Sequence, residues 1–143
     1  MSVIKNVLIR KILDSRGNPT VEVEIFTQGG YGSASAPSGA SVGANEVMAF
    51  PKKGVDFAIE NFRHNVAPKL IGEDVTEQEN IDSLLHEIDE TENFSNIGGN
   101  VAVATSIAAA KAGAFISRLP LYEYLGGPSE KSIPFPLGNI LGG

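Results

Sequence analysis

The first third of the chain alternates between apolar and polar residues in the way that β-strands do. The alternation is cleanest over residues 20–27, where valine and isoleucine point to one face and glutamate to the other. A β-branched segment at 3–13 and a segment of small residues at 31–36 flank it. Turn-forming residues occupy 14–19 and 29–30. The pattern predicts a three-stranded antiparallel meander.

From residue 54 onward the period changes to that of helices. Apolar residues recur three or four positions apart over 55–70 and again over 76–90. An alanine-rich run at 101–118 predicts a third helix that packs closely on both sides, and a short fourth helix follows at 121–125. Strands followed by helices indicate an α+β domain, with the helices on one face of the sheet.

Several residues predict where these elements begin and end. Pro68 is expected to kink or end the first helix, since proline lacks an N–H group. Thr76 and Glu79 have the spacing of a capping box at the start of the second helix. The α+β domain is expected to cover residues 1–132, and residues 133–143 are expected to be a strand or linker that leads elsewhere.

Composition excludes several classes of protein. The chain has 143 residues, of which 42% are hydrophobic, and its formal net charge is −6. An acidic chain argues against binding to nucleic acid or to an anionic membrane. There is no cysteine, hence no disulfide or thiolate site. No apolar run is expected to reach the roughly 20 residues of a membrane span, and no signal peptide is recognised, so we expect a cytoplasmic protein.

A search for chemistry-bearing residues gives few candidates outside one loop. His64 and His86 lie on separate predicted helices and are read as ordinary helix residues rather than metal ligands. The acidic run at 87–92 is read as a solvated helix end. Residues 37–43 read Pro-Ser-Gly-Ala-Ser-Val-Gly, all small, with two glycines and two hydroxyls. Such a segment is either a loop that closes over a ligand or a flexible surface connection.

Beyond composition, the motifs resemble a known family. Residues 14–24 read Asp-Ser-Arg-Gly-Asn-Pro-Thr-Val-Glu-Val-Glu and are similar to the N-terminal signature of enolases. The loop at 37–43 resembles the enolase loop Ser-Gly-Ala-Ser-Thr-Gly. Residues 97–100 and 119–127 resemble two further enolase motifs, and residues 134–143 resemble the crossing into the enolase barrel. The resemblance covers essentially the whole chain in order.

The resemblance implies a specific function. Enolases dehydrate 2-phosphoglycerate to phosphoenolpyruvate in glycolysis and gluconeogenesis with two Mg²⁺ ions, and they form homodimers or higher homo-oligomers. Their N-terminal α+β domain caps a β/α barrel that holds the magnesium carboxylates, the lysine base and the glutamate acid. The resemblance therefore places no catalytic residue in this chain. It assigns the closing loop to Ser38, Gly39, Ala40, Ser41, Val42 and Gly43. It makes Ser41 a ligand of the second Mg²⁺ on loop closure, and it places Arg16 and Glu22 at the dimer interface.

The chain departs from the family pattern at several positions. Val42 stands where the family usually has threonine, and the stretch at 47–52 lacks the usual acid–arginine pair. Phe94 replaces a usual lysine, Gly99 replaces alanine, and residues 139–143 lack a second asparagine. A β/α barrel needs roughly 250 residues, and none of it is present. We therefore expect these 143 residues to be inactive alone.

Three interpretations stay open at this point. The chain is either the N-terminal domain of a longer enolase or a free-standing, enolase-like binding module without catalysis. An excised domain should expose an apolar patch where the barrel docks, whereas a free-standing domain should be polar there. The third interpretation, the cap of another enzyme of the enolase superfamily, is weaker because those relatives generally lack the Ser-Gly-Ala-Ser loop.

Overall fold

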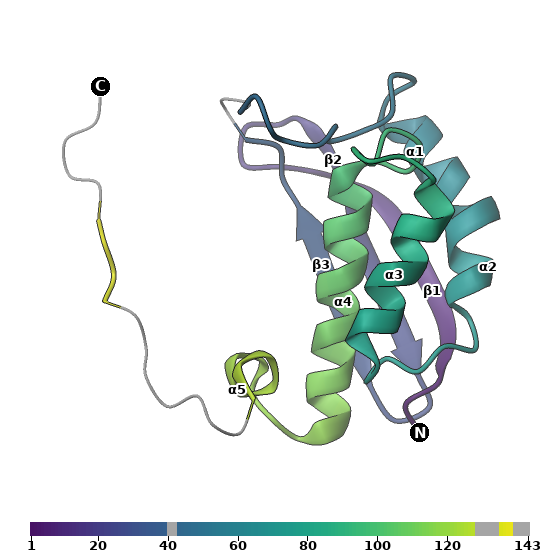
Figure 1. Ribbon diagram of the computed structural model, residues 1–143, viewed down its shortest axis with the longest axis vertical. Coiled ribbons are helices and arrows are strands. Elements are labelled where there is room, and N and C mark those ends of the chain that lie inside the picture. Colours follow the sequence, from purple (N-terminus) through teal and green to yellow (C-terminus); the bar gives the residue numbers. More distant parts are fainter. Residues whose placement is uncertain (40–42, 128–134, 139–143) are drawn as a thin grey trace.

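The computed structural model describes residues 1–39, 43–127 and 135–138. These residues form two layers, a twisted antiparallel sheet and a set of helices on one of its faces (Figure 1). Strands β1 (Ile4–Leu13), β2 (Pro19–Thr27) and β3 (Tyr31–Ala36) lie in the order β1-β2-β3. The predicted meander is therefore confirmed.

Hairpin turns fix the register of the sheet. β1 pairs with β2 from Ile4 opposite Thr27 to Leu13 opposite Pro19. In the turn between them, Asp14 Oδ1 accepts hydrogen bonds from the backbone N–H groups of Asn18 and Arg16, both at 2.9 Å. These two bonds hold the pKa of Asp14 below its usual value, because they favour the charged carboxylate. The turn predicted at 14–19 is therefore held by a carboxylate from within the turn itself.

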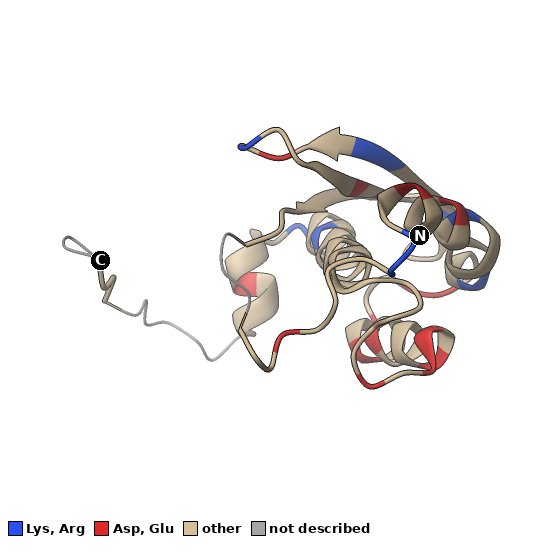
Figure 2. Cartoon of the chain, turned by 90° about the horizontal axis from the view of Figure 1, so that it is seen from above, with Lys and Arg blue, Asp and Glu red and all other residues tan. Residues whose placement is uncertain are grey.

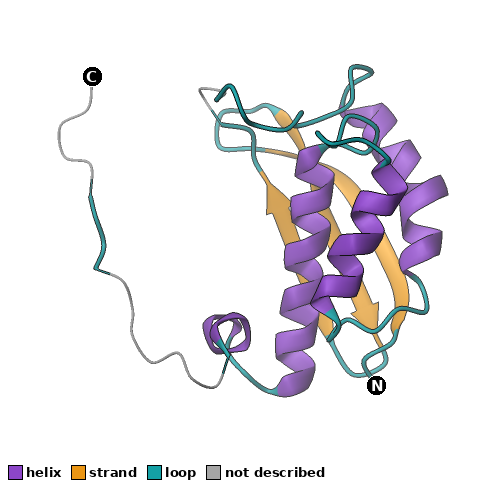
Figure 3. Ribbon diagram, viewed as in Figure 1, coloured by secondary structure: helices purple, strands orange, loops and turns teal. Residues whose placement is uncertain are grey.

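Within the described residues, the helices form four segments (Figure 3). Helix α1 (Val55–Asn61), the π-helical turn η1 (Phe62–Val66) and helix α2 (Ala67–Leu70) follow one another without a break. Helix α3 (Gln78–Asp89), helix α4 (Gly99–Ser117) and the short helix α5 (Leu121–Gly126) complete the set. The order of the elements, with the strands first and the helices afterwards, confirms the predicted α+β class.

Pro68 neither ends nor sharply breaks the first helical segment, which continues to Leu70. The helix instead widens one turn earlier, where the N–H of Ala67 donates to the carbonyl of Phe62 five residues back. Proline cannot donate to the carbonyl four residues before it, and its ring clashes there. A wider π turn directly before the proline relieves that conflict.

The capping box predicted at Thr76 and Glu79 is not formed. α3 begins at Gln78, and no side chain caps its N-terminus. The side chain of Thr76, which was expected to cap the helix, bonds to Asp74 instead. Asp74 Oδ1 accepts from the backbone N–H of Thr76 at 2.9 Å and from its hydroxyl at 2.6 Å. The Asp74 carboxylate also accepts from Ser2 Oγ at 2.6 Å, and these bonds lower its pKa. In place of a side-chain cap on α3, the segment before the helix is therefore tied to the N-terminus through the bond between Asp74 and Ser2.

Helix α4 is the centre of the core. It lies across β2 and β3, between the sheet and α3 (Figure 1). It is 19 residues long and apolar enough to cross a membrane by length and composition alone, so the expectation that no segment reaches this limit is wrong. Most of that helix is nevertheless buried inside the domain, with Val101, Ala104, Ala108 and Ala112 fully covered. Its composition is that of a core helix.

Apart from Asp89, the charged residues of the described ranges lie on the outside of both layers (Figure 2). α3 carries acidic residues and neither lysine nor arginine, whereas the basic residues of β1 lie on the sheet (Figure 2). At the other end of the chain, residues 135–138 have no regular secondary structure, and Phe135 and Leu137 are almost fully exposed. The rest of the expected linker at 133–143 lies outside the described residues, so the proposed domain boundary stays a prediction.

Candidate functional site

The small-residue loop leaves the sheet at the end of β3 and returns to the first turn of α4. Residues 37–39 form its first arm and residues 43–49 its second arm. Of the six predicted loop residues, Ser38 and Gly39 lie in the first arm and Gly43 begins the second. Ala40, Ser41 and Val42 lie outside the described residues, so the proposed metal contact of Ser41 stays a prediction.

Asn100 holds the first arm of the loop. Its side-chain Nδ2 donates to the carbonyl oxygen of Ala36 at 2.8 Å and to Ser38 Oγ at 3.2 Å. The hydroxyl of Thr20, buried in β2, donates to the same Ala36 carbonyl. The last residue of β3 is thus tied both to the neighbouring strand and to α4. These hydrogen bonds fix the position of the residue from which the first arm begins.

The same turn of α4 holds the second arm. The backbone N–H of Asn100 donates to the carbonyl of Ala49 at 3.0 Å, and that of Gly99 donates to Met48 at 2.7 Å. The first N–H groups of a helix have no partner within the helix, so the second arm supplies their acceptors. At the start of this arm, Glu46 Oε1 accepts from the N–H of Gly43 at 3.0 Å. Asn100 therefore anchors both arms, one through its side chain and one through its backbone.

A hollow of about 550 Å³ lies between the two arms and α4. Small residues of the first arm and the side chains of Val103 and Ile107 on α4 line it, and Glu46 is the acidic side chain among its lining residues. Hollows of this volume accommodate small-molecule ligands. The loop is therefore built around a space, as its composition suggested.

Two of the departures from the family pattern fit one another. A Cβ atom placed on Gly99 would lie 2.5 Å from Cγ2 of Val47, far inside van der Waals contact. Val47 belongs to the divergent stretch at 47–52, and Gly99 stands where the family usually has alanine. The glycine makes room for the valine, so the two changes leave the second arm seated on α4.

Asp89 supports this end of α4 from beneath, and the sequence reading of it was wrong. The acidic run at 87–92 was expected to be a solvated helix end, and Glu87, Glu90 and Glu92 are exposed, but the side chain of Asp89 is fully buried. Asp89 Oδ1 accepts from the backbone N–H groups of Ile97 and Asn96 at 2.7 and 3.0 Å, and Oδ2 accepts from Thr91. These bonds compensate for burial of the carboxylate and shape the loop that leads into α4.

The two histidines lie on different helical segments, as expected. His64 is exposed, with Nε2 3.6 Å from a carboxylate oxygen of Glu60, and His86 stacks against Phe94 with 4.6 Å between ring centres. Over residues 1–39, 43–127 and 135–138, no three His, Cys, Asp or Glu side chains are placed to hold a metal ion.

The residues predicted for a dimer interface lie apart. Arg16 is in the exposed β1–β2 turn, whereas Glu22 is in β2 on the sheet face that carries no helix. The side chain that meets Glu22 is Arg10, opposite it in the register, with Glu24 3.6 Å away. The hydroxyl of Tyr31 donates to Glu24 at 2.8 Å. The sequence analysis missed Arg10, although cross-strand pairing in the hairpin would have placed it opposite Glu22.

Comparison with known proteins agrees with this geometry. The family model described as "Enolase, N-terminal domain" matches residues 4–125, from the first residue of β1 to the last turn of α5. The chain belongs to the enolase family. The match includes every described helix and strand together with both arms of the loop. The resemblance seen in the motifs is therefore confirmed over the whole folded unit.

Relatives from archaea and bacteria show the extent of the likeness. The chain is 54% identical over 142 residues to the enolase of Methanothermobacter thermautotrophicus, which covers 99% of this chain and 34% of the relative. It is 50% identical over 147 residues to the enolase of Pyrococcus furiosus (98% and 34%) and 49% identical over 152 residues to that of Bdellovibrio bacteriovorus (100% and 36%). The chain thus spans about a third of the length of these curated relatives.

Proposed function

We propose that this chain is the N-terminal capping domain of an enzyme that dehydrates 2-phosphoglycerate to phosphoenolpyruvate, a phosphopyruvate hydratase of glycolysis and gluconeogenesis. The observation that carries the proposal is the family match over residues 4–125 within relatives about three times as long. The lyase chemistry would belong to the remaining length. We expect the complete enzyme to work in the cytoplasm.

An apolar stripe on α4 supports the interpretation as one domain of a larger protein. Val103, Ile107 and Phe115 are 48%, 39% and 63% exposed, and their spacing of four or eight residues places them on one face of the helix. Tyr122 and Leu125 of the neighbouring helix α5 are 75% and 64% exposed. Side chains of this kind gathered over two adjacent helices are typical of a surface that another domain covers. A free-standing binding module would need a polar surface there.

The chain's contribution to catalysis would be the loop. We propose that Ser41, between the two arms, reaches the second of two Mg²⁺ ions when the loop closes over substrate. Magnesium would stabilise the negative charge that develops on the substrate carboxylate. Asn100 would keep both arms on α4 while the residues between them move, and the closed loop would exclude water. The carboxylates that hold the metal would come from the remaining length.

The same proposal makes the isolated chain inactive. We expect residues 1–143 to show no dehydration of 2-phosphoglycerate above a buffer blank at saturating magnesium. The general base, the general acid and the metal carboxylates would all be absent from it. Turnover that chelation of magnesium abolishes would contradict this expectation.

Association into a homodimer is part of the proposal, with Arg16 and Glu22 at the interface. The helix-free face of the sheet supports it, because Leu8 is 46% exposed there beside the charged side chains of β1 and β2. Sedimentation of the complete protein tests it. Glu22→Gln should weaken association, whereas Glu79→Gln on α3 should leave it unchanged.

The intact mass of the native protein, detected in its source cell with an antibody against this domain, separates the two main interpretations. We expect a mass of about 45 kDa, the sum of this domain and a barrel, and magnesium-dependent dehydratase activity in the captured protein. A mass of 15.0 kDa would overturn the proposal in favour of a free-standing binding module. A longer protein that acts on another substrate would favour a different enzyme of the superfamily.

A further inference from the structure

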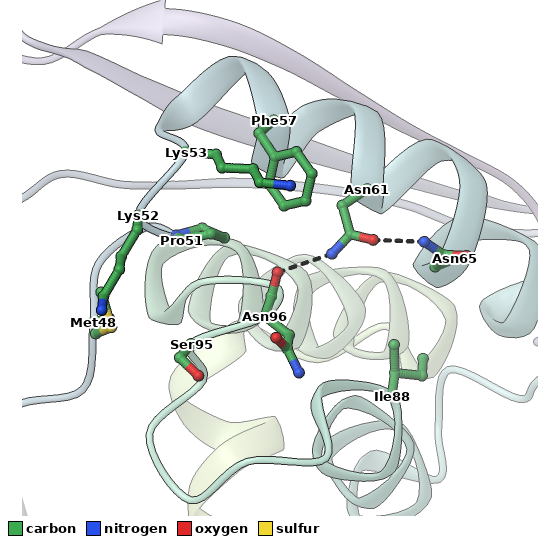
Figure 4. A pocket seen from close by; sticks show the side chains of 10 residues that line it. All are labelled: Met48, Pro51, Lys52, Lys53, Phe57, Asn61, Asn65, Ile88, Ser95 and Asn96. Carbon is green, nitrogen blue, oxygen red and sulfur yellow. Dashed lines mark hydrogen bonds between the residues drawn. The ribbon is translucent and has the colours of Figure 1, made fainter.

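A second hollow, of about 510 Å³, lies on the other side of the second arm of the loop (Figure 4). It is bounded by residues 48–53, by the outward side of α1 and by the loop between α3 and α4. Met48, Pro51 and Ile88 form its apolar part. Met48 also lines the hollow inside the loop, so the two spaces share only that side chain. Nothing in the proposed enolase reaction uses this second hollow.

The charge of the hollow is opposite to that of the chain. The formal net charge is −6, yet the charged residues that line the hollow are Lys52 and Lys53. Neither lysine forms an ion pair within the described ranges, and Lys53 Nζ lies 4.6 Å from the centre of the Phe57 ring. Figure 4 shows the two lysines at different points of the rim, Lys53 along Phe57 and Lys52 beside Met48.

The acidic residues of α1 are occupied elsewhere. Asp56 Oδ1 accepts from Lys11 Nζ on β1 at 2.6 Å, and Glu60 Oε1 accepts from Arg63 at 2.8 Å. Neither carboxylate is among the residues that line the hollow. The lysines at the rim therefore meet no opposing charge from α1.

A row of amides forms one wall. Asn65 Nδ2 donates to Asn61 Oδ1 at 2.6 Å, and Asn61 Nδ2 donates to the backbone carbonyl of Asn96 at 2.9 Å (Figure 4). Each amide nitrogen carries two hydrogens and uses one in this row, so one further donor remains on each. The row runs along the π-helical turn η1, and such turns are frequent at functional sites.

We propose that this hollow binds a small organic phosphomonoester, with the phosphate group held by Lys53 and the amide donor of Asn61, while Lys52 adds positive charge from another point of the rim and Asn65 positions Asn61. Two ammonium groups match the charge of a phosphate dianion, and its oxygens are acceptors for the amide hydrogens. The volume far exceeds a bare phosphate and falls in the range of small-molecule sites. The organic part would lie on the apolar surface of Met48, Pro51 and Ile88.

Three probes separate the contributions of charge and of the organic part. Phenyl phosphate carries both, inorganic phosphate carries only the charge, and benzyl alcohol carries only an apolar ring. Titration of ¹⁵N-labelled chain should give saturable amide shifts at residues 51–61 and 95–96. We expect a dissociation constant of about 1 mM for phenyl phosphate, weaker binding of inorganic phosphate and no saturation with benzyl alcohol. Because the rim lysines are exposed, added salt should weaken binding.

The double variant Lys52→Gln/Lys53→Gln should weaken phenyl phosphate binding about tenfold. Its matched control is Lys5→Gln/Lys69→Gln, which removes the same charge from exposed lysines outside the hollow and should leave the affinity within twofold. Asn65→Ala, which changes no charge, should weaken binding about threefold. Far-UV circular dichroism confirms that each variant is folded.

Three outcomes would overturn the proposal. One is an absence of saturable shifts at the hollow with any phosphate probe. Another is an equal loss of affinity in both double lysine variants, which would mean general attraction of anions to the surface. The third is tighter binding of inorganic phosphate than of phenyl phosphate, which would mean that the ligand is free phosphate and not an organic phosphomonoester. None of these results bears on the loop or on the enolase reaction.

Discussion

The two ends of α4 are held by different physical means. Towards its C-terminal half, β3 and α5 approach so closely that glycines are required at the contacts. At its N-terminal turn, α4 meets the loop through hydrogen bonds from Gly99 and Asn100 to the two arms, and through a close contact between Gly99 and the side chain of Val47. The first end depends on steric fit alone, whereas the second depends also on a few polar atoms. Substitutions in the C-terminal half of α4 should therefore mainly lower the free energy of unfolding. Substitutions at its N-terminal turn should mainly reduce local protection from hydrogen exchange.

Gly32→Ala should have the largest effect. A Cβ atom at residue 32 of β3 would lie 2.1 Å from the carbonyl oxygen of Ala108 and 2.5 Å from the backbone nitrogen of Ala112. Neither backbone atom can move without displacing α4 from the sheet, so we expect a loss of about 3 kcal/mol or more in the free energy of unfolding. Chemical denaturation measures it, with Ser35→Ala on the exposed face of the same strand as control. Equal stability of both variants would contradict this steric account.

Gly113→Ala should act next, by releasing α5. A Cβ atom there would lie 2.4 Å from the hydroxyl oxygen of Tyr124, which packs against α4 at this point. The clashing group is the end of a side chain, so α5 can move away, and the higher helix propensity of alanine offsets part of the cost. We expect a net loss of about 1 kcal/mol and faster hydrogen exchange in residues 121–126. Protection of those amides as in the unmodified chain would show that the contact tolerates a methyl group.

The same contact gives a pH dependence. Burial raises the pKa of the Tyr124 hydroxyl, and the charges of Asp74 and Glu77 raise it further. A group with a raised folded pKa contributes stability that is complete below its unfolded pKa, about 10, and is lost as pH rises through the folded value. Stability should therefore fall above about pH 10. Tyr124→Phe should reduce that fall, while Tyr122→Phe, at an exposed position of α5, should not.

Asn100→Ala tests the hydrogen-bonded N-terminal turn of α4. The variant removes the bonds to the Ala36 carbonyl and Ser38 Oγ but leaves the backbone N–H bond to Ala49. We expect a loss of about 1 kcal/mol, with hydrogen exchange accelerated more in the first arm than in the second. Asn80→Ala, at an exposed site on α3, is the control. Equal acceleration in both arms would mean that the side chain supports the turn as a whole.

The Gly99–Val47 pair should give the smallest change in stability. Gly99→Ala alone should cost about 0.5 kcal/mol, because the contact with Val47 is partly offset by the higher helix propensity of alanine, whereas Gly99→Ala in a Val47→Ala background should cost nothing or stabilise the helix. A double-mutant cycle measured by thermal unfolding gives the coupling energy. Additive effects would mean that the two departures from the family pattern are independent.

Periodic elements could be predicted from the sequence, and contacts between distant residues could not. The alternation at 20–27 and the alanine run at 101–118 determined β2 and α4 to within a few residues, because both patterns repeat along the element. The capping box failed because the hydroxyl of Thr76 binds Asp74 instead, and no local pattern reveals the second partner of Asp74, Ser2, 72 residues away. Burial of Asp89 was missed although its partners follow within eight residues, because an acidic run at a helix end has the composition of an exposed surface.

The candidate site also has a part that could be predicted from the sequence and a part that could not. The small residues at 37–43 marked a loop with room for a ligand, and the structure places a hollow beside its two arms. Asn100, which anchors that loop, had no local signal of its role, since its acceptors lie in β3 and in the two arms. The second hollow draws its polar wall from Asn61, Asn65 and Asn96, and its parts are equally scattered along the sequence.

The central place of α4 also determines when this domain can fold during synthesis. The meander from Ile4 to Ala36 leaves the ribosome before the helices, and α1 to α2 cover only the part of its apolar face near β1, so β2 and β3 lack their main cover until the helix that begins at Gly99 has been made. A sheet of this size with one face uncovered is only marginally stable. The strands therefore wait, exposed to aggregation, while the intervening residues are translated. We expect folding to be a single late event, and nascent chains that stop before α4 should depend on chaperones.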